Sequence, residues 1–235
     1  MANLIHTLIQ QQVVDKLNNN MRVLRVENIE GEENIQRVKF CDIKWLKLYN
    51  RFMEGQIVID YDVDGWLFLQ VDDPLKVGDI LSIQIPLFFH GTPYNTMEEW
   101  HNFVDEEGRN REDVKLPFIW LKTPSAINQK DIRSPFKYSA RMKLFFVHYS
   151  DWTKKNEFRV NQSIEPLNAL KEEFIKAINN NVMYFNRLSN EGDSKDFPKF
   201  GKETEKGVEK TYFNSTLAGV MLDLSIEVKN DLCFC

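Results

Sequence analysis

Hydrophobic residues recur every four positions at the start of the chain. The apolar positions with this spacing are Ile5, Ile9, Val13, Leu17 and Met21. Because an α-helix turns once every 3.6 residues, side chains at this spacing lie on one face. The pattern predicts a helix over residues 4–18, which ends at the run of three Asn residues that follows.

Short apolar runs separated by turn residues dominate the next part of the chain. A strand is predicted at residues 21–28, and the stretch 36–90 is β-rich. Its clearest feature is a hairpin over residues 56–71, in which Asp64-Gly65 separates two apolar runs. This residue pair suits a two-residue type I′ turn, because Gly adopts positive φ without steric cost. Residues 80–89 predict a further strand, which contains one Pro.

Polar and apolar segments alternate after this strand. Residues 91–115 are polar and predict a surface loop with one helical turn near Trp100. The apolar run at 115–121 is typical of a buried strand, and residues 122–136 predict a loop. Residues 138–149 are the strongest candidate for a central strand, because four large apolar side chains lie at their centre.

A second amphipathic helix is predicted over residues 165–178, with Pro166 in its first turn. We expect both helices to pack against the strand at 138–149. The side chains expected in this core are Leu8, Leu17, Leu170, Phe174 and Ile178 from the helices, with Leu144 and Phe146 from the strand.

The last part of the chain predicts a loop and then a strand. Residues 189–215 alternate Lys with Asp and Glu, and they predict a charged loop that is mobile in the isolated subunit. The final segment alternates apolar and polar residues, which is the pattern of a strand. Its apolar positions are Leu222, Leu224, Ile226 and Val228.

Helical and strand periods in one chain favour an α+β fold. We expect a mostly antiparallel sheet with two helices packed on one face. The chain is predicted to form a single domain over residues 1–235, with a β-rich insertion at about 36–110.

Composition narrows the class of protein. The 235 residues are 43% hydrophobic and 28% charged, which is typical of a soluble globular chain. A net charge of −5 argues against a basic module that grips duplex DNA. Three Cys residues argue against a disulfide scaffold, and no apolar run is long enough to span a membrane. We therefore predict a cytoplasmic product that does not enter membranes.

Two motifs resemble metal sites only in part. Asp60, Asp62 and Asp64-Gly65 match the first half of a calcium-binding loop, but its twelfth position, which requires Glu, is Val71. A hairpin with an acidic face is the favoured interpretation, and a metal-dependent enzyme that uses Asp60, Asp62 and Asp64 is an alternative.

Other candidate motifs are also incomplete. Glu98 and His101 lack the first His of a zinc-protease helix, and Cys233 with Cys235 lacks a second ligand pair. The sequence shows no motif that combines a nucleophile with a base. We therefore predict that the protein is not an enzyme and uses no metal and no cofactor.

A series of short motifs, in order, resembles the tail terminator or tail completion proteins of tailed phages, especially phages of Bacteroidetes hosts. The resemblance covers roughly half of the chain, and the N-terminal helix and strand also fit the opening of these proteins. Its motifs are Leu116-Pro-Phe-Ile-Trp-Leu121, Ala140-Arg-Met-Lys-Leu-Phe-Phe-Val147, Asp151-Trp-Thr-Lys-Lys155, Ile164-Glu-Pro-Leu-Asn-Ala-Leu170, Phe200-Gly-Lys202, and Leu217 to Val228.

The resemblance implies a virion structural protein at the head–tail junction, made in the bacterial cytoplasm. Such proteins form homo-oligomeric rings that contact neck, connector or tail-tube proteins, and DNA passes through the lumen. They have no catalytic residues. We expect the ring interface to use sheet edges or the final strand, with Leu222, Leu224, Ile226 and Val228 as its candidate residues. The alternative is a cytoplasmic adaptor that binds a peptide at a sheet edge.

Overall fold

The protein has an α+β fold, as the sequence predicts. The computed structural model describes residues 2–41, 44–62, 64–104, 108, 110, 115–129, 137–186, 188, 192–205, 208–211, 213 and 215–229. The chain forms two compact units. The main unit combines Met1–Leu17 with Pro86–Cys235, and the inserted unit is Asn18–Ile85.

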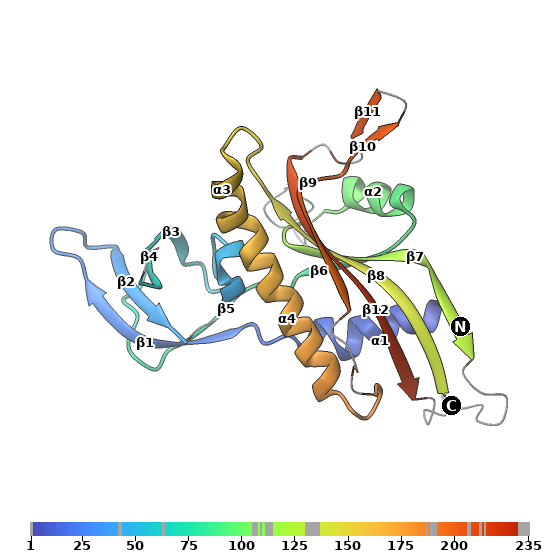
Figure 1. The fold of residues 1–235 in the computed structure, drawn as a ribbon. Coiled ribbons are helices and arrows are strands. Elements are labelled where there is room, and N and C mark those ends of the chain that lie inside the picture. Colours follow the sequence, from blue (N-terminus) through green and yellow to red (C-terminus); the bar gives the residue numbers. More distant parts are fainter. Residues whose placement is uncertain are drawn as a thin grey trace. The chain divides into compact units, whose positions relative to one another are not determined.

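A five-stranded sheet is the centre of the main unit (Figure 1). Its order is β6-β7-β8-β12-β9, and all neighbours are antiparallel except β6 and β7. The strands are β6 (Leu87–Gly91), β7 (Phe118–Gln129), β8 (Lys137–Tyr149), β12 (Leu217–Lys229) and β9 (Asp193–Phe200). A separate two-stranded hairpin joins β10 (Lys202–Glu205) to β11 (Val208–Thr211).

Two helices cover one face of this sheet, as predicted. Helix α4 (Glu165–Asn180) packs on β8 and β12, and α1 (Ala2–Gln12) packs on β7. The Asn181 side chain donates a hydrogen bond to the Gln12 carbonyl at 2.9 Å, which ties the ends of the two helices together. The predicted core is confirmed: the seven expected side chains are buried, and the rings of Phe146 and Phe174 lie 5.4 Å apart.

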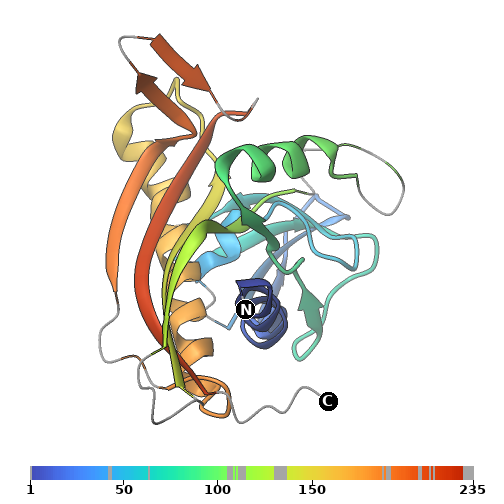
Figure 2. The ribbon, with the colours of Figure 1, turned by 90° about the vertical axis from the view of Figure 1, so that its right-hand side faces the viewer.

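Aromatic side chains cover the opposite face. The buried cluster there consists of Phe89, Trp100, Leu116, Phe118, Trp120, Phe145, Val147, Phe200, Phe213 and Leu217. Helix α2 (Pro93–Asn102) packs on β6 and contributes Trp100 to this cluster. Since successive strand residues point to opposite faces, Phe145 packs in the aromatic cluster and Phe146 packs against the helices. Figure 2 shows the strands of this sheet and the helices from a second direction, turned by 90° from the view of Figure 1.

The inserted unit contains a five-stranded sheet in the order β3-β4-β2-β1-β5. The strands are β1 (Asn20–Asn28), β2 (Ile35–Phe40), β3 (Ile57–Tyr61), β4 (Trp66–Gln70) and β5 (Ile80–Ser82). Residues 50–54 connect its two edges. The Met53 amide donates to the Ser82 carbonyl on β5, and the Val58 amide on β3 donates to the Asn50 carbonyl, each at 2.8 Å.

The predicted hairpin is present, but its turn is not the expected two-residue turn of Asp64-Gly65: the Gly65 amide donates to the Asp62 carbonyl at 3.1 Å, so the turn begins at Asp62. Gly65 has a φ of +78°, and the Asp62 amide donates to the Trp66 carbonyl at 2.8 Å. Strands β3 and β4 flank this turn. Short helical segments complete the structure: η1 (Val14–Lys16), η2 (Lys44–Leu48), α3 (Asn156–Arg159) and a π-helical turn (Val160–Ile164) that runs directly into α4.

Several boundaries differ from the sequence-based expectations. The inserted unit ends at Ile85 instead of about residue 110, because the predicted strand at 80–89 is two strands, β5 and β6, in different units. The first helix ends at Gln12, and a 3₁₀ turn replaces its last part. The predicted loop at 122–136 is wrong for its first half, because β7 continues to Gln129.

The polar segment at 91–115 contains a full helix instead of one turn. Helix α2 begins after Thr92, whose hydroxyl accepts a hydrogen bond from the Asn95 amide at 3.3 Å, and Pro93 occupies its first turn. Only two of its side chains, Thr96 and Trp100, are buried. So sparse an apolar stripe explains why the sequence pattern did not predict this helix.

The largest error concerns the charged segment at 189–215, which is not a loop over its described residues. Strands β9, β10 and β11 occupy most of it. Phe197 and Phe200 pack against the aromatic cluster, so β9 has enough apolar contact to join the sheet. Gly192 and Gly201, with φ of +79° and +81°, turn the chain at its two ends.

We predict that Phe174→Ala lowers the free energy of unfolding by about 3–5 kcal/mol, because it leaves a large cavity between α4 and β8. Denaturant unfolding measures the change. Lys176→Ala, at an exposed position of the same helix, is the matched control. An unfolding midpoint unchanged by Phe174→Ala would contradict this packing.

We predict that Gly219→Ala destabilises the protein by about 1–3 kcal/mol through overpacking. A Cβ atom at this position would lie 2.7 Å from Cδ2 of Phe200, so the ring that holds β9 would have to shift. Thermal unfolding of this variant is compared with Ser225→Ala, an exposed position on the same strand. Equal melting temperatures would show that Phe200 does not pack over Gly219.

Candidate interaction surface

The four residues predicted as an oligomer interface do not form a surface. Leu222, Leu224, Ile226 and Val228 are all buried, with 0%, 2%, 1% and 8% of their area exposed. Strand β12 pairs with β8 along its whole length and with β9 over residues 217–223. The alternating pattern thus marks a central strand with a buried face, and the expectation that these side chains meet another subunit is corrected.

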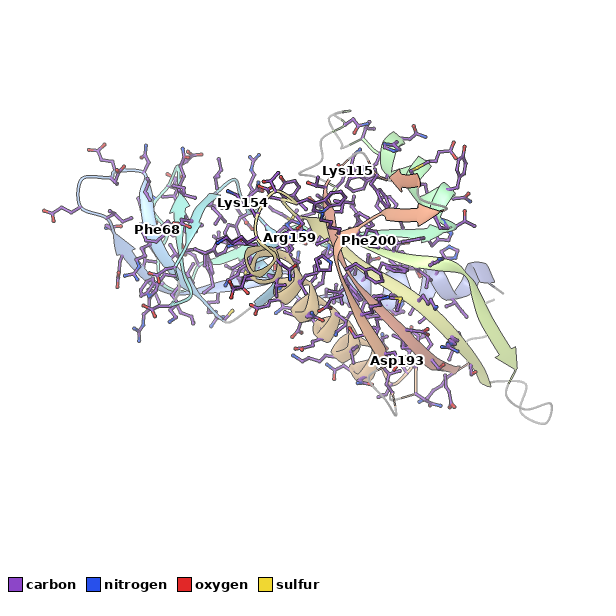
Figure 3. All side chains as sticks on the ribbon, turned by 45° about the horizontal axis from the view of Figure 1, so that its top comes forward. Phe68, Lys115, Lys154, Arg159, Asp193 and Phe200 are labelled. Carbon is purple, nitrogen blue, oxygen red and sulfur yellow. The ribbon has the colours of Figure 1, made fainter. Side chains whose placement is uncertain are left out.

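The sheet edges remain as candidates, and the two edges differ in chemistry. Strand β9 forms one edge, and Asp193 and Phe200 mark its ends in Figure 3. Between them the strand carries Lys195, Asp196 and Pro198. Charged residues and Pro are the means by which edge strands prevent pairing with other chains. We therefore regard β9 as a protected edge.

Side chains of α4 also anchor the protected edge. The Lys171 ammonium donates a hydrogen bond to the Ser194 hydroxyl at 2.9 Å, and the Asn168 amide donates to the Asp196 carboxylate at 3.4 Å. In these contacts, polar side chains of β9 form hydrogen bonds with α4 of the same subunit. They hold the strand in the sheet despite its high charge.

The other edge is open over part of its length. Strand β6 pairs with β7 only over residues 118–122, so among the described strands residues 123–129 of β7 have no neighbour on their outer side. We call residues 123–129 the open edge. Its inner side pairs with β8 from Ala126 to Gln129, after an irregularity between Lys122 and Ala126. None of its seven residues is charged, and its single Pro is Pro124.

The hairpin of β10 and β11 is a third feature of the main unit. Four residue pairs join its strands, from Lys202–Thr211 to Glu205–Val208, and neither strand pairs with any other described strand. Its base is fixed: Phe200 and Phe213, just outside the two strands, stack 5.9 Å apart within the aromatic cluster. The hairpin projects beyond the sheet from this base (Figure 1).

The Asp223 carboxylate on β12 is paired with two cationic side chains of β8. The Asp223 carboxylate accepts hydrogen bonds from the Arg141 guanidinium at 3.0 and 3.2 Å, and the Lys143 ammonium lies 3.7 Å away. The Arg141 hydrogen bond, the main cause, lowers the pKa of Asp223. This group links β8 to β12 and is therefore a structural ion pair.

The acidic residues of the inserted unit bind neighbours within the chain. Asp62 accepts a hydrogen bond from the Asp64 amide at 2.8 Å and one from Arg37 at 2.6 Å, and these two contacts, in that order, lower its pKa. Asp60 accepts from the Tyr61 amide at 2.8 Å. Over the described part of the chain, no three His, Cys, Asp or Glu residues are grouped as metal ligands. Cys233 and Cys235 lie outside the described residues.

Sequence reasoning missed a pair of histidines. The rings of His6 on α1 and His90 on β6 stack 3.7 Å apart at an angle of 6°. Burial, and to a smaller extent the neighbouring His6, lower the pKa of His90. No sequence signal connects positions 84 residues apart, because only the fold brings α1 beside β6.

Comparisons with known proteins identify no relative: no family model, no curated protein and no solved structure matches the chain. The phage family therefore stays a prediction from the sequence. Among the described helices, none combines the length and the apolar character that crossing a membrane requires.

We predict that His148 makes stability pH-dependent. Burial lowers its pKa to about 4 from an ordinary value of 6.5, and its Nδ1 atom is buried without a hydrogen-bond partner. The unfolded chain therefore binds a proton that the folded chain does not. Stability is present above pH 6.5 and is lost as the pH falls toward 4.

The variant His148→Leu should lose less stability than the wild type between pH 7.5 and pH 5. Denaturant unfolding at both pH values measures the difference, and His101→Leu on α2 is the control. The same pH dependence in His148→Leu and the wild type would show that His148 is not the responsible group.

Proposed function

We propose that the protein is a virion structural protein that forms a homo-oligomeric ring at the head–tail junction of a tailed phage, as a tail terminator or a neck ring. The observation that carries this proposal is the pair of unlike edges on the main sheet. A protected edge lies at one side, and an open edge lies at the other.

Unlike edges favour a ring for a geometric reason. A two-fold dimer uses the same surface twice, whereas a head-to-tail contact joins two different surfaces and closes into a ring when the rotation between subunits permits. A subunit with a single open edge needs a different partner surface on its neighbour. The main unit therefore has the asymmetry that a cyclic assembly requires.

The fold supports the same family. The sequence resemblance implies two helices on one face of a mostly antiparallel sheet, and α1 and α4 lie in this way on the main sheet. The motifs that carry the resemblance occupy β7, β8, α4 and β12, which belong to the main unit. Apart from β1, the inserted unit lies outside the segments that carry the resemblance, and it is available to contact neck, connector or tail-tube proteins.

The charge of the chain suits a ring through which DNA moves. With a net charge of −5, the subunit lacks the basic excess that would hold phosphates by releasing counterions. A globular domain of 235 residues, treated as a sphere, is about 45 Å across; six such spheres in a ring leave a hole of about the same width, which a duplex can pass, and twelve leave a wider one. DNA contact is then transient and independent of sequence.

We predict that the purified protein assembles into rings. Light scattering should give a discrete multiple of the 27.8 kDa subunit mass, and electron microscopy of the same sample should show closed rings. Mass spectrometry of purified virions should detect the protein in a fixed copy number.

Two results would refute the proposal. A protein that stays monomeric at high concentration, with or without the phage connector, cannot act as a ring. Its absence from purified virions would exclude a structural role in the particle. Tight binding of one host peptide by the monomer would instead favour an adaptor that uses the open edge.

A further inference from the structure

We propose that the hairpin of β10 and β11 of one subunit pairs with the open edge of β7 in a second copy of the same chain. The neighbour's sheet then gains strands beyond residues 123–129. This inference rests on the proposed ring and names the contact that would build it.

The hairpin has the properties of a donor. Two-stranded hairpins are marginally stable in water unless a further strand or a helix packs on them. Strands β10 and β11 pair with each other and with no other described strand. Their base is held by Phe200 and Phe213, so the hairpin is positioned before it meets a partner.

The open edge has the properties of an acceptor. Its outer backbone groups have no strand partner among the described residues, and it carries neither the charges nor the central Pro that protect β9. The part that is regularly paired with β8, Ala126–Gln129, spans four residues. Each hairpin strand also has four residues. The lengths of donor and acceptor therefore match.

The position of the two features excludes pairing within one subunit. The hairpin projects from one end of the main sheet, and the open edge lies at the opposite end, in both Figure 1 and Figure 2. A second copy of the chain therefore has to supply the strand. Because hairpin and edge are different surfaces, each subunit can donate to one neighbour and accept from the other, which is a head-to-tail contact.

Two variants separate donor from acceptor. In the first, two Gly residues replace residues 202–211, a short link that suffices because Lys202 and Thr211 are directly paired. In the second, Ala126→Lys and Asn128→Lys give the open edge the charges of a protected edge. The matched control, Gln10→Lys with Gln11→Lys, adds the same charge at exposed positions of α1.

Light scattering should show assembly for the wild type and the control, and a monomer for each of the two variants. An equimolar mixture of the variants should give a heterodimer of about twice the 27.8 kDa subunit mass, since only one complete donor–acceptor pair remains. Melting temperatures of the variants within about 3 °C of the wild type would show that folding is intact.

Cross-linking gives a measurement that does not depend on these variants. In a background of Cys41→Ser, Cys233→Ser and Cys235→Ser, a protein with Thr204→Cys is mixed with one carrying Asn128→Cys. A short bifunctional thiol reagent should join the two chains. The same reaction with His101→Cys in place of Asn128→Cys should not.

The outcomes distinguish this inference from the proposed function. Rings of unchanged size from the hairpin-deleted variant would overturn the hairpin contact and leave the proposed ring intact. Open head-to-tail chains in place of rings, with the expected heterodimer, would retain the contact and refute closure. A monomeric wild type with no cross-link would overturn both.

Discussion

The main unit depends on one strand, β12, whose apolar face is buried along its whole length. Strand β12 pairs with β8 through all 13 of its residues and with β9 through its first half. One face of it packs under α4, and the other contributes Leu217 to the aromatic cluster. Because this face is buried and β12 lies between β8 and β9 in the sheet, its apolar side chains are not available to another subunit, and the edges of the sheet belong to β6, β7 and β9.

The two cores on either side of the sheet differ in the side chains that form them. The helical side contains aliphatic side chains with Phe146 and Phe174 between them. The opposite side is aromatic, and it includes residues from the chain segments before and after the hairpin, Phe200 and Phe213. The same cluster that stabilises the fold therefore also positions the hairpin, so the core and the proposed assembly contact share residues there.

The sequence predicted the elements whose side chains alternate or repeat cleanly. Strands β8 and β12 and helix α4 follow regular apolar patterns of period 2 or 3.6. The side chains predicted to lie in their shared core are buried. Strand β9 was missed because Lys195, Asp196 and Lys199 resemble a solvated loop, although charge on an edge strand serves to prevent pairing. The open edge was missed for the opposite reason, since Pro124 near its start suggested a loop.

The alternation of apolar and polar residues in a strand does not show whether its apolar side chains pack within the subunit or against another subunit. The pattern from Leu222 to Val228 is the same for a strand that meets another subunit and for one that meets its own helix. Only the pairing on both sides of β12 decides between them. For the same reason the stacked His6 and His90 had no signal in the sequence, because their contact depends on the position of α1.

The two points at which the chain enters and leaves the inserted unit lie next to each other. The Asn19 side chain donates a hydrogen bond to the Ile83 carbonyl, and the Ile83 amide donates to the Asn19 carbonyl, both at 3.0 Å. The inserted unit Asn18–Ile85, which follows α1 and precedes β6 in the sequence, thus has its two ends close together. Such a module can be acquired, lost or exchanged during evolution without rebuilding the host fold. In the proposed ring, exchange of this unit would change the neighbouring protein that the subunit contacts and leave the contacts of the main sheet in place.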